Sequence, residues 1–201
     1  MITVIQQFFG INDPRPIEGF MSWQHLTFVS VLVLIMALLA ITTSAMAATG
    51  LGSVTSVSLT PATAEKAGSV SVNTTMCAVT LDDAGKIVAI KFDVVQPKAA
   101  FDATGAASGE LKAAPQTKKE LKEGYGMLKA SAIGKEWYEQ AAVLEAWCIG
   151  KTVEEVLGMK TFDRGDGSHT MVPDEADLVA GCTITVGDYL KALSKAAADA
   201  Q

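Results

Sequence analysis

The chain has 201 residues, of which 49% are hydrophobic and 19% charged, and its mean hydropathy of +0.29 is high for a wholly soluble protein. Acidic side chains outnumber basic ones 22 to 16, so the net charge is −6 and a surface that binds nucleic acid is not expected. Three cysteines are too few for a small domain held together by disulfides. The composition indicates a globular domain of ordinary size plus a segment that accounts for the apolar excess.

The apolar excess is concentrated between Leu26 and Ala48, a stretch that carries no charge. A helix rises about 1.5 Å per residue, so this stretch is long enough to cross a bilayer. It closes with Ala45-Met46-Ala47, the small-residue pattern at which signal peptidase cleaves. Residues 1–48 are therefore expected to be an export signal or a single membrane anchor that contains one apolar helix, and both alternatives stay open. Under both, the rest of the chain is exported to the extracellular face of the cytoplasmic membrane or the cell surface.

The next part of the chain changes from a small-residue stretch to alternating strands. Residues 49–67 are rich in Thr, Ser, Ala and Gly and are interpreted as a linker to a domain over residues 68–201. Residues 68–81 alternate between apolar and polar side chains, which is typical of a half-buried strand. An Asp-Asp-Ala-Gly turn signal and a second alternating run over residues 86–95 follow, so the sequence predicts an antiparallel β-hairpin.

The C-terminal half has the signals of helices. Thr117 and Thr152 each stand three residues before a Glu, which is the pattern of a capping box at a helix start. The clearest helical periodicity covers residues 135–149, and a last amphipathic helix is predicted over residues 183–198. Strands followed by helices predict an α+β domain in which an antiparallel hairpin or sheet packs with C-terminal helices, preceded by the apolar N-terminal helix.

The segment with the most pointed chemistry stands just before the last predicted helix and reads DLVAGCTIT, from Asp177 to Thr185. Gly181 permits a tight or left-handed turn, and Thr183 is expected at the N-cap of the helix. The free amides of a first helical turn and the positive end of the helix dipole favour a phosphate there. Two interpretations of Thr183 stay open: a helix cap and nothing more, or a residue that contacts or carries a phosphate-bearing ligand.

This segment resembles the motif of the FMN-binding domain family, found in flavin-carrying subunits of membrane redox pumps and in extracellular electron-transfer proteins. The family pattern is Asp-x-x-Ser/Thr-Gly-Ala-Thr/Ser, then an apolar residue, Thr or Ser, and an amphipathic helix. The resemblance covers roughly residues 68–198. It implies that an FMN transferase links the flavin phosphate to Thr183 as a phosphoester, and the cofactor-binding set it implies is Thr183, Gly181, Asp177, Cys182 and Thr185. Two positions depart from the pattern, because Ala180 replaces a Ser or Thr and Cys182 replaces an Ala.

The resemblance implies an exported or membrane-anchored domain that acts in electron transfer at the outer face of the membrane. Its cofactor would be FMN, its partners an FMN transferase and a membrane redox protein, and it would carry electrons rather than turn over a substrate. The alternative is a cofactor-free cell-surface binding or structural module with the same fold, which the two departures favour. No metal site is expected, because the acidic loop over residues 163–177 lacks EF-hand spacing and His169 has no neighbouring ligand.

Two further groups of side chains have alternative interpretations. Trp137 and Trp147 could stack on a flavin ring, but their helical spacing is more typical of a hydrophobic core. Cys77, Cys148 and Cys182 each stand among apolar neighbours, so three buried thiols are as consistent with the sequence as one disulfide.

Overall fold

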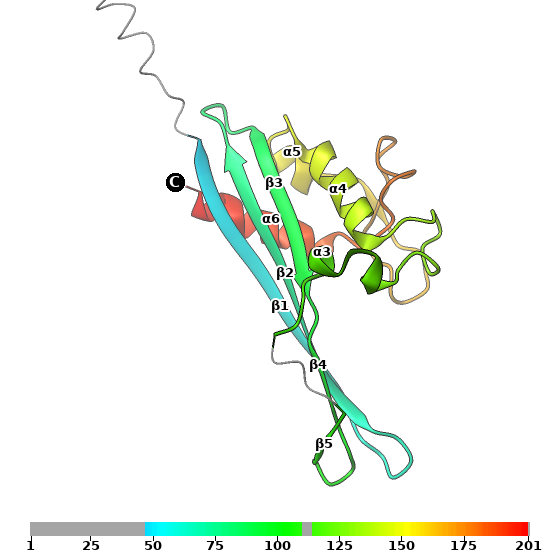
Figure 1. The fold of residues 1–201 in the computed structure, drawn as a ribbon. Helices are drawn as coiled ribbons and strands as arrows, with labels where there is room; N and C mark the ends of the chain where they lie inside the picture. The colour runs from blue at the N-terminus through cyan, green and yellow to red at the C-terminus, as the bar shows by residue number, and fades with distance from the viewer. Residues whose placement is uncertain (1–46, 110–113, 201) are drawn as a thin grey trace, which may run out of the picture. The chain divides into compact units, whose positions relative to one another are not determined.

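A long antiparallel pair of strands carries the fold. The structure is a computed structural model that describes residues 47–109 and 114–200. Strand β1 (Ala48–Thr60) pairs along its whole length with β2 (Gly68–Leu81), from Ala48 opposite Leu81 to Thr60 opposite Ser69. Figure 1 shows the two strands running side by side as the longest elements of the sheet. The strand predicted over residues 68–81 is confirmed.

The second edge of β2 is shared by two shorter strands. One end of β2 pairs with β3 (Ile87–Val95), and the other end pairs with β4 (Lys98–Phe101), which in turn pairs with β5 (Ala107–Ser108). The predicted hairpin between β2 and β3 is confirmed. Gly85 closes its turn with φ at +73°, a left-handed value that glycine adopts readily.

The helices follow the sheet in the chain, as the sequence predicts. Their bounds are α3 (Lys118–Leu121), a 3-10 turn (Lys122–Tyr125), α4 (Trp137–Cys148), α5 (Val153–Leu157) and α6 (Gly187–Asp199). Capping boxes are present at Thr117 of α3 and Thr152 of α5, as predicted. A short hairpin of β6 (Thr161–Phe162) and β7 (Val172–Pro173) separates α5 from α6. The domain is therefore α+β, with an antiparallel sheet and C-terminal helices.

Helix α6 lies across β1 and β2, and α4 lies against β3 (Figure 1). Between them is one hydrophobic core to which both the sheet and the helices contribute, including Phe92, Leu144 and Leu193. Glu145 of α4 is buried and accepts a hydrogen bond of 2.8 Å from the backbone N–H of Phe92. Its carboxylate also pairs with Lys91 at 2.9 Å and with Lys119. This carboxylate therefore joins α4 to the outer edge of β3.

The linker expected over residues 49–67 is wrong for most of its length, because residues up to Thr60 are strand β1. The small residues of this stretch have a packing role. A Cβ on Gly50 would overlap the carbonyl oxygen of Ala196, and one on Gly52 would overlap that of Ala192. Close approach of α6 thus requires glycine in β1, and composition alone does not separate such a strand from a flexible tether.

The three cysteines are free and buried, and all belong to the hydrophobic core. The structure thus selects the buried thiols over the disulfide. The apolar helix expected within residues 1–48, and with it the choice between signal and anchor, falls almost entirely outside the described residues. Among helices of the described ranges, none combines the length and hydropathy that crossing a membrane requires.

Candidate functional site

The motif segment forms a tight turn before α6. The backbone N–H groups of Gly181 and Cys182 both donate to the carbonyl oxygen of Leu178, each at 2.8 Å. Gly181 does not adopt a positive φ, so the left-handed alternative is wrong. Glycine is required here for another reason, because a Cβ would lie 2.7 Å from Cγ1 of Val143 on α4. The turn therefore packs the motif segment directly onto α4.

Thr183 is not the N-cap of the last helix, which begins only at Gly187 and has no side-chain cap. Instead, the backbone N and Oγ1 of Thr183 both donate to Oε1 of Gln140, at 2.8 and 3.2 Å. Gln140 is fully buried, and its Nε2 donates to Oγ of Ser131 and to the carbonyl oxygen of Lys135. The N-cap prediction failed because it rested on local spacing alone. The hydroxyl of Thr183 instead donates to Gln140, which is distant in sequence.

The other predicted site residues separate in space. Asp177 is exposed on the loop. Cys182 is completely buried in the core, and this burial raises the pKa of its thiol to about 11. Thr185 faces a cavity, together with its neighbour Ile184. Of the five residues that the family resemblance implies, Thr185 is thus the one that lines this cavity.

The cavity has a volume of about 590 Å³ and lies at the start of α6. This volume is within the range of about 300–1,000 Å³ that is usual for small-molecule sites. Its walls come from β2, β3, α3, α4, the loop over residues 168–171 and the first turns of α6. Elements that are far apart in sequence therefore converge on it.

Aromatic rings form one side of this cavity. Nε1 of Trp137 donates a hydrogen bond of 3.0 Å to the hydroxyl of Tyr189, and their ring centroids are 6.2 Å apart. Phe92 packs edge-on against Tyr189 from the core, at 5.5 Å and 81°. Burial raises the pKa of Tyr189, so its hydroxyl is neutral. Trp137 belongs to the hydrophobic core and also lines the cavity. The sequence analysis treated core packing and a place at the ligand site as alternatives for this residue.

A buried lysine also faces the cavity. Lys118 is 9% exposed, and its Nζ lies 4.6 Å from the ring centroid of Tyr125 and 5.4 Å from that of Trp137. Burial lowers the pKa of Lys118 to about 8, while the nearby Asp93 opposes this shift. Within the part of the chain that the structure describes, no hydrogen bond or ion pair reaches this ammonium group. Sequence analysis missed Lys118, because the capping box locates α3 but does not tell which of its lysines is buried.

The rim of the cavity is a hydrogen-bonded loop. Nδ1 of His169 lies 2.7 Å from Oδ2 of Asp166. Backbone N–H groups of Ser168 and His169 lower the pKa of Asp166 to about 2, so this carboxylate stays ionised. Met171 has a φ of +55°, which is strained for a residue with a side chain, and its carbonyl oxygen accepts from the N–H of Val186 at 3.0 Å. The loop is thus fixed beside the start of α6.

No three His, Cys, Asp or Glu side chains of the described ranges come together in a way that could hold a metal ion. The loop over residues 163–171 is held instead by carboxylates that accept backbone N–H groups, as Asp163 does from Gly165 at 2.7 Å.

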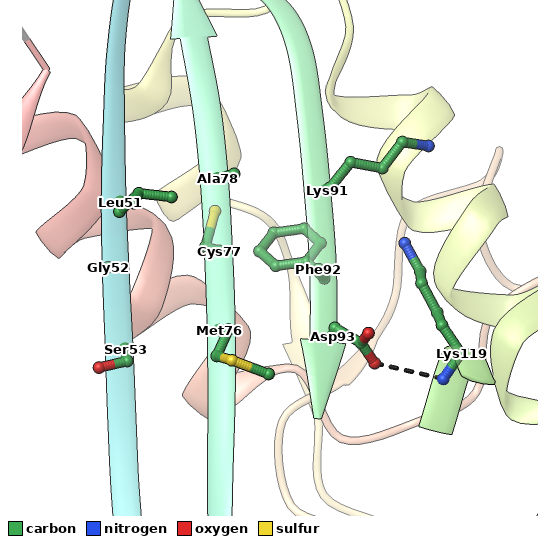
Figure 2. Close-up of a pocket in the computed structure, with 10 residues that line it drawn as sticks. All are labelled: Leu51, Gly52, Ser53, Met76, Cys77, Ala78, Lys91, Phe92, Asp93 and Lys119. Atoms are coloured by element: carbon green, nitrogen blue, oxygen red, sulfur yellow. Dashed lines mark hydrogen bonds between the residues drawn. The ribbon is translucent and has the colours of Figure 1, made fainter. Parts of the chain in front are cut away.

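A groove of about 530 Å³ crosses β1, β2 and β3 elsewhere on the sheet. Figure 2 shows its lining side chains, among them Leu51, Met76 and Lys91, and the hydrogen bond between the N–H of Lys119 and Asp93. The two lysines on its border both pair with Glu145. Since its charges are already paired, this groove is a weaker ligand site than the cavity at α6.

Comparison with known proteins gives one partial likeness. The chain is 40% identical over 99 residues to a chlorophenol reductase of Desulfitobacterium hafniense, a match that covers 42% of this chain and 29% of that protein. The chain thus spans less than a third of the relative's length. No family model matches the chain, and no solved structure matches it.

Proposed function

We propose that the domain binds FMN in the cavity at α6 and acts in electron transfer at the outer face of the membrane, as an exported or membrane-anchored protein with a membrane redox partner. The observation that carries this proposal is the meeting of three features in one cavity. Ile184 and Thr185 come from the motif segment, Tyr125 supplies a partly exposed aromatic ring, and the first turn of α6 adds free amides.

The chemistry of the lining suits FMN, which has a planar aromatic ring, a hydroxylated chain and a phosphate. Tyr125, whose ring is partly exposed, offers apolar surface to the isoalloxazine, whereas Trp137 is only 2% exposed and contributes to the wall as a core residue. Thr75, Asn73 and Thr185 offer hydrogen-bonding groups along the cavity wall. Oδ1 of Asn73 is buried and has no hydrogen-bond partner among the described residues, so a donor on a ligand would satisfy it.

The flavin would supply the redox chemistry, and the residues of this chain would bind and orient it. Trp137 is held in place by its hydrogen bond to Tyr189, so its ring is a fixed wall rather than a mobile lid. Burial keeps Tyr189 neutral, which avoids a negative charge beside a reduced flavin. The cavity would thereby exclude bulk water from one side of the ring.

The name of the partial relative supports a redox role. A chlorophenol reductase delivers electrons to its substrate, and the aligned residues make up less than a third of that protein. The likeness supplies no substrate for this chain.

Non-covalent binding is the form that the geometry favours. Thr183 does not line the cavity, and its hydroxyl is bonded to Gln140. A phosphoester at Thr183 would require this hydroxyl to leave Gln140. Attachment by an FMN transferase is therefore the second form of the proposal, and its test is separate.

The experiment is to purify the full chain, with and without coexpressed FMN transferase, and to record its visible absorbance and its intact mass. We expect flavin absorbance that is released on denaturation, or that appears when FMN is added. An FMN mass increment that survives denaturation and disappears in Thr183→Val would establish the covalent form. Protein that neither carries nor binds flavin under either condition would overturn the proposal.

The cofactor-free module remains a second candidate, and the position of Cys182 favours it. Its side chain is completely buried in the core, so the residue that replaces the family's Ala serves packing. The double variant Ala180→Ser with Cys182→Ala restores the family pattern. Flavin bound by this variant and not by the starting protein would support the cofactor-free module.

A further inference from the structure

Lys118 is only 9% exposed, and no hydrogen bond or ion pair among the described residues reaches its ammonium group. Moving a charge out of water is unfavourable unless an opposite charge or hydrogen bonds compensate for it. Its two cation–π contacts, with Tyr125 and Trp137, compensate only in part. The residue as a whole is 9% exposed, yet it lines the wall of the 590 Å³ cavity. Its free hydrogen-bonding capacity is therefore directed at whatever fills that cavity.

The first turn of α6 contributes a second group of free donors to the same cavity. This helix has 13 residues and no side-chain cap, and Gly187, Asp188 and Tyr189 all line the cavity. Their N–H groups are those that a helix leaves without an internal acceptor. Together with the positive end of the helix dipole, such amides bind anions. Two independent features thus provide positive potential in one cavity.

The other charged groups of the cavity leave this potential available. Asp188 is in the first turn of α6, but its carboxylate pairs with Lys191 at 3.1 Å. His169 on the rim pairs with Asp166. Asp93 acts on Lys118 from β3, and its Oδ1 accepts the N–H groups of Val94 and Lys119. Each acidic group near the cavity therefore already has a partner of its own.

We propose that Lys118 and the first turn of α6 form a subsite for the phosphate of a phosphate monoester, which recognises that phosphate without a covalent bond. This inference rests on the proposed function and specifies where the phosphate of the same ligand is bound. It makes the phosphate, and not only the aromatic ring, a determinant of which ligand the cavity accepts. The phosphate would pair directly with the ammonium group, whereas Asp93 acts on Lys118 without forming an ion pair with it.

The test compares FMN with riboflavin, which has the same ring and side chain but no phosphate. Binding of each is followed by flavin fluorescence on the full chain produced without a transferase, and inorganic phosphate is added as a competitor. The variants are Lys118→Met, which keeps the apolar stem, and Lys118→Arg, which keeps the charge. Lys129→Met is the matched control, because Lys129 is exposed and does not line this cavity. Circular dichroism checks that each variant is folded.

A charge-assisted contact is worth about ten- to hundredfold in affinity, so we expect FMN to bind about tenfold or more tighter than riboflavin. Lys118→Met should abolish this preference while riboflavin affinity changes by less than about twofold, and Lys118→Arg should retain most of it. Phosphate should compete with FMN and stabilise the starting protein against heat, but not Lys118→Met. Lys129→Met should behave like the starting protein.

The outcomes separate this inference from the proposed function. Equal affinity for FMN and riboflavin would overturn the phosphate subsite and leave the flavin function standing. Equal loss of both flavins in a folded Lys118→Met would also overturn it, because Lys118 would then only shape the cavity. If neither flavin binds but phosphate stabilises the protein through Lys118, the subsite stands and the flavin function fails. If neither flavins nor phosphate have any effect, both proposals are overturned.

Discussion

The two ends of helix α6 differ in how completely their polar groups are satisfied. Towards the C-terminus, Ala192 and Ala196 are completely buried against the glycines of β1. Asp199 accepts the N–H of Leu51 at 3.0 Å, and Lys195 donates to the carbonyl oxygen of Ser53 at 2.8 Å. This end therefore uses its hydrogen-bonding groups and its surface within the fold.

The N-terminal end leaves comparable groups unused. The first turn lacks a side-chain cap, Oδ1 of Asn73 is buried without a hydrogen-bond partner in the described residues, and no hydrogen bond or ion pair among those residues reaches Nζ of Lys118. Unsatisfied buried groups reduce stability, and they persist where a ligand provides the missing partner. The comparison teaches that one end of the helix uses its polar groups within the fold, whereas the other end leaves some of them available, which is where we propose that a ligand binds. Four experiments sharpen or break it.

The largest effect is expected at the packed end. Gly52→Val should lower the free energy of unfolding by about 3 kcal/mol, because its Cβ would overlap the backbone of α6 and force the helix away from β1. Urea denaturation measures this loss. Ser53→Val is the matched control on the same strand, where the side chain is exposed, and it should change stability by less than about 0.5 kcal/mol. Equal effects of the two substitutions would contradict close packing of α6 on β1.

The second prediction concerns the hydrogen bonds that fix the motif segment. Gln140→Leu should cost about 2–3 kcal/mol, because it leaves the buried donors and acceptors around Gln140 without partners. Thr183→Val should cost only about 1 kcal/mol, since the backbone N–H of residue 183 still reaches Gln140. Chemical denaturation of both variants gives the ratio. A larger loss for Thr183→Val would show that the hydroxyl, rather than the glutamine, organises this segment.

The third prediction tests the unsatisfied end through pH. Burial lowers the pKa of Lys118 from 10.5 to about 8, so between these values the unfolded chain binds more protons than the folded one. The stability contribution of Lys118 should therefore rise with pH from about 8 to about 10.5, with a slope of at most about 1.4 kcal/mol per pH unit. Asp93 opposes the shift, and the cavity also contains Asp188, Lys191 and His169.

The slope is obtained as the difference between the starting protein and Lys118→Met in urea unfolding at several pH values. Taking the difference removes the titration of every other group. A flat difference over this range would mean that Lys118 is as well hydrated or paired in the folded chain as in the unfolded one. The proposed contrast between the two ends of α6 would then be lost.

The smallest effect is on thiol reactivity. Burial raises the pKa of Cys77 and Cys148 to about 12, and that of Cys182 to about 11, so thiolate is scarce at pH 8. We expect no thiol to react with a disulfide reagent in the folded protein and all three to react in urea, as counted by absorbance or mass. Rapid labelling of Cys182 in the folded protein would place it in an open site rather than in the core.

Local signals were enough to predict the central hairpin and the helix starts at Thr117 and Thr152. Each of these depends on residues within a few positions of one another: alternation, a turn with glycine, or a hydroxyl three residues before Glu. The same signals failed for β1, because its glycines are required by α6, which is more than a hundred residues away in the chain. The neighbouring residues in the sequence do not show that a position must be glycine for such a distant contact.

The candidate site was predicted only in part for a similar reason. Thr185 lies at the cavity, and Gly181 makes the expected tight turn. The hydroxyl of Thr183, however, donates a hydrogen bond to Gln140 and does not line the cavity. Lys118 lines the cavity only because α3 packs beside Trp137. A sequence motif can identify one segment near a candidate site. The charged side chains that line the same cavity come from distant parts of the chain, and only the tertiary fold brings them there.

The carboxylate of Glu145 has a consequence for how copies of this domain meet. It accepts a hydrogen bond from the N–H of Phe92 on the outer edge of β3. On β1, Asp199 accepts from the N–H of Leu51, and Lys195 donates to the carbonyl oxygen of Ser53. Exposed strand edges are where sheets of separate molecules fuse into aggregates. A foreign strand could pair at these positions only by first displacing a charged side chain of α4 or α6. Side chains of α4 and α6 therefore oppose edge-to-edge association of the sheet with another molecule.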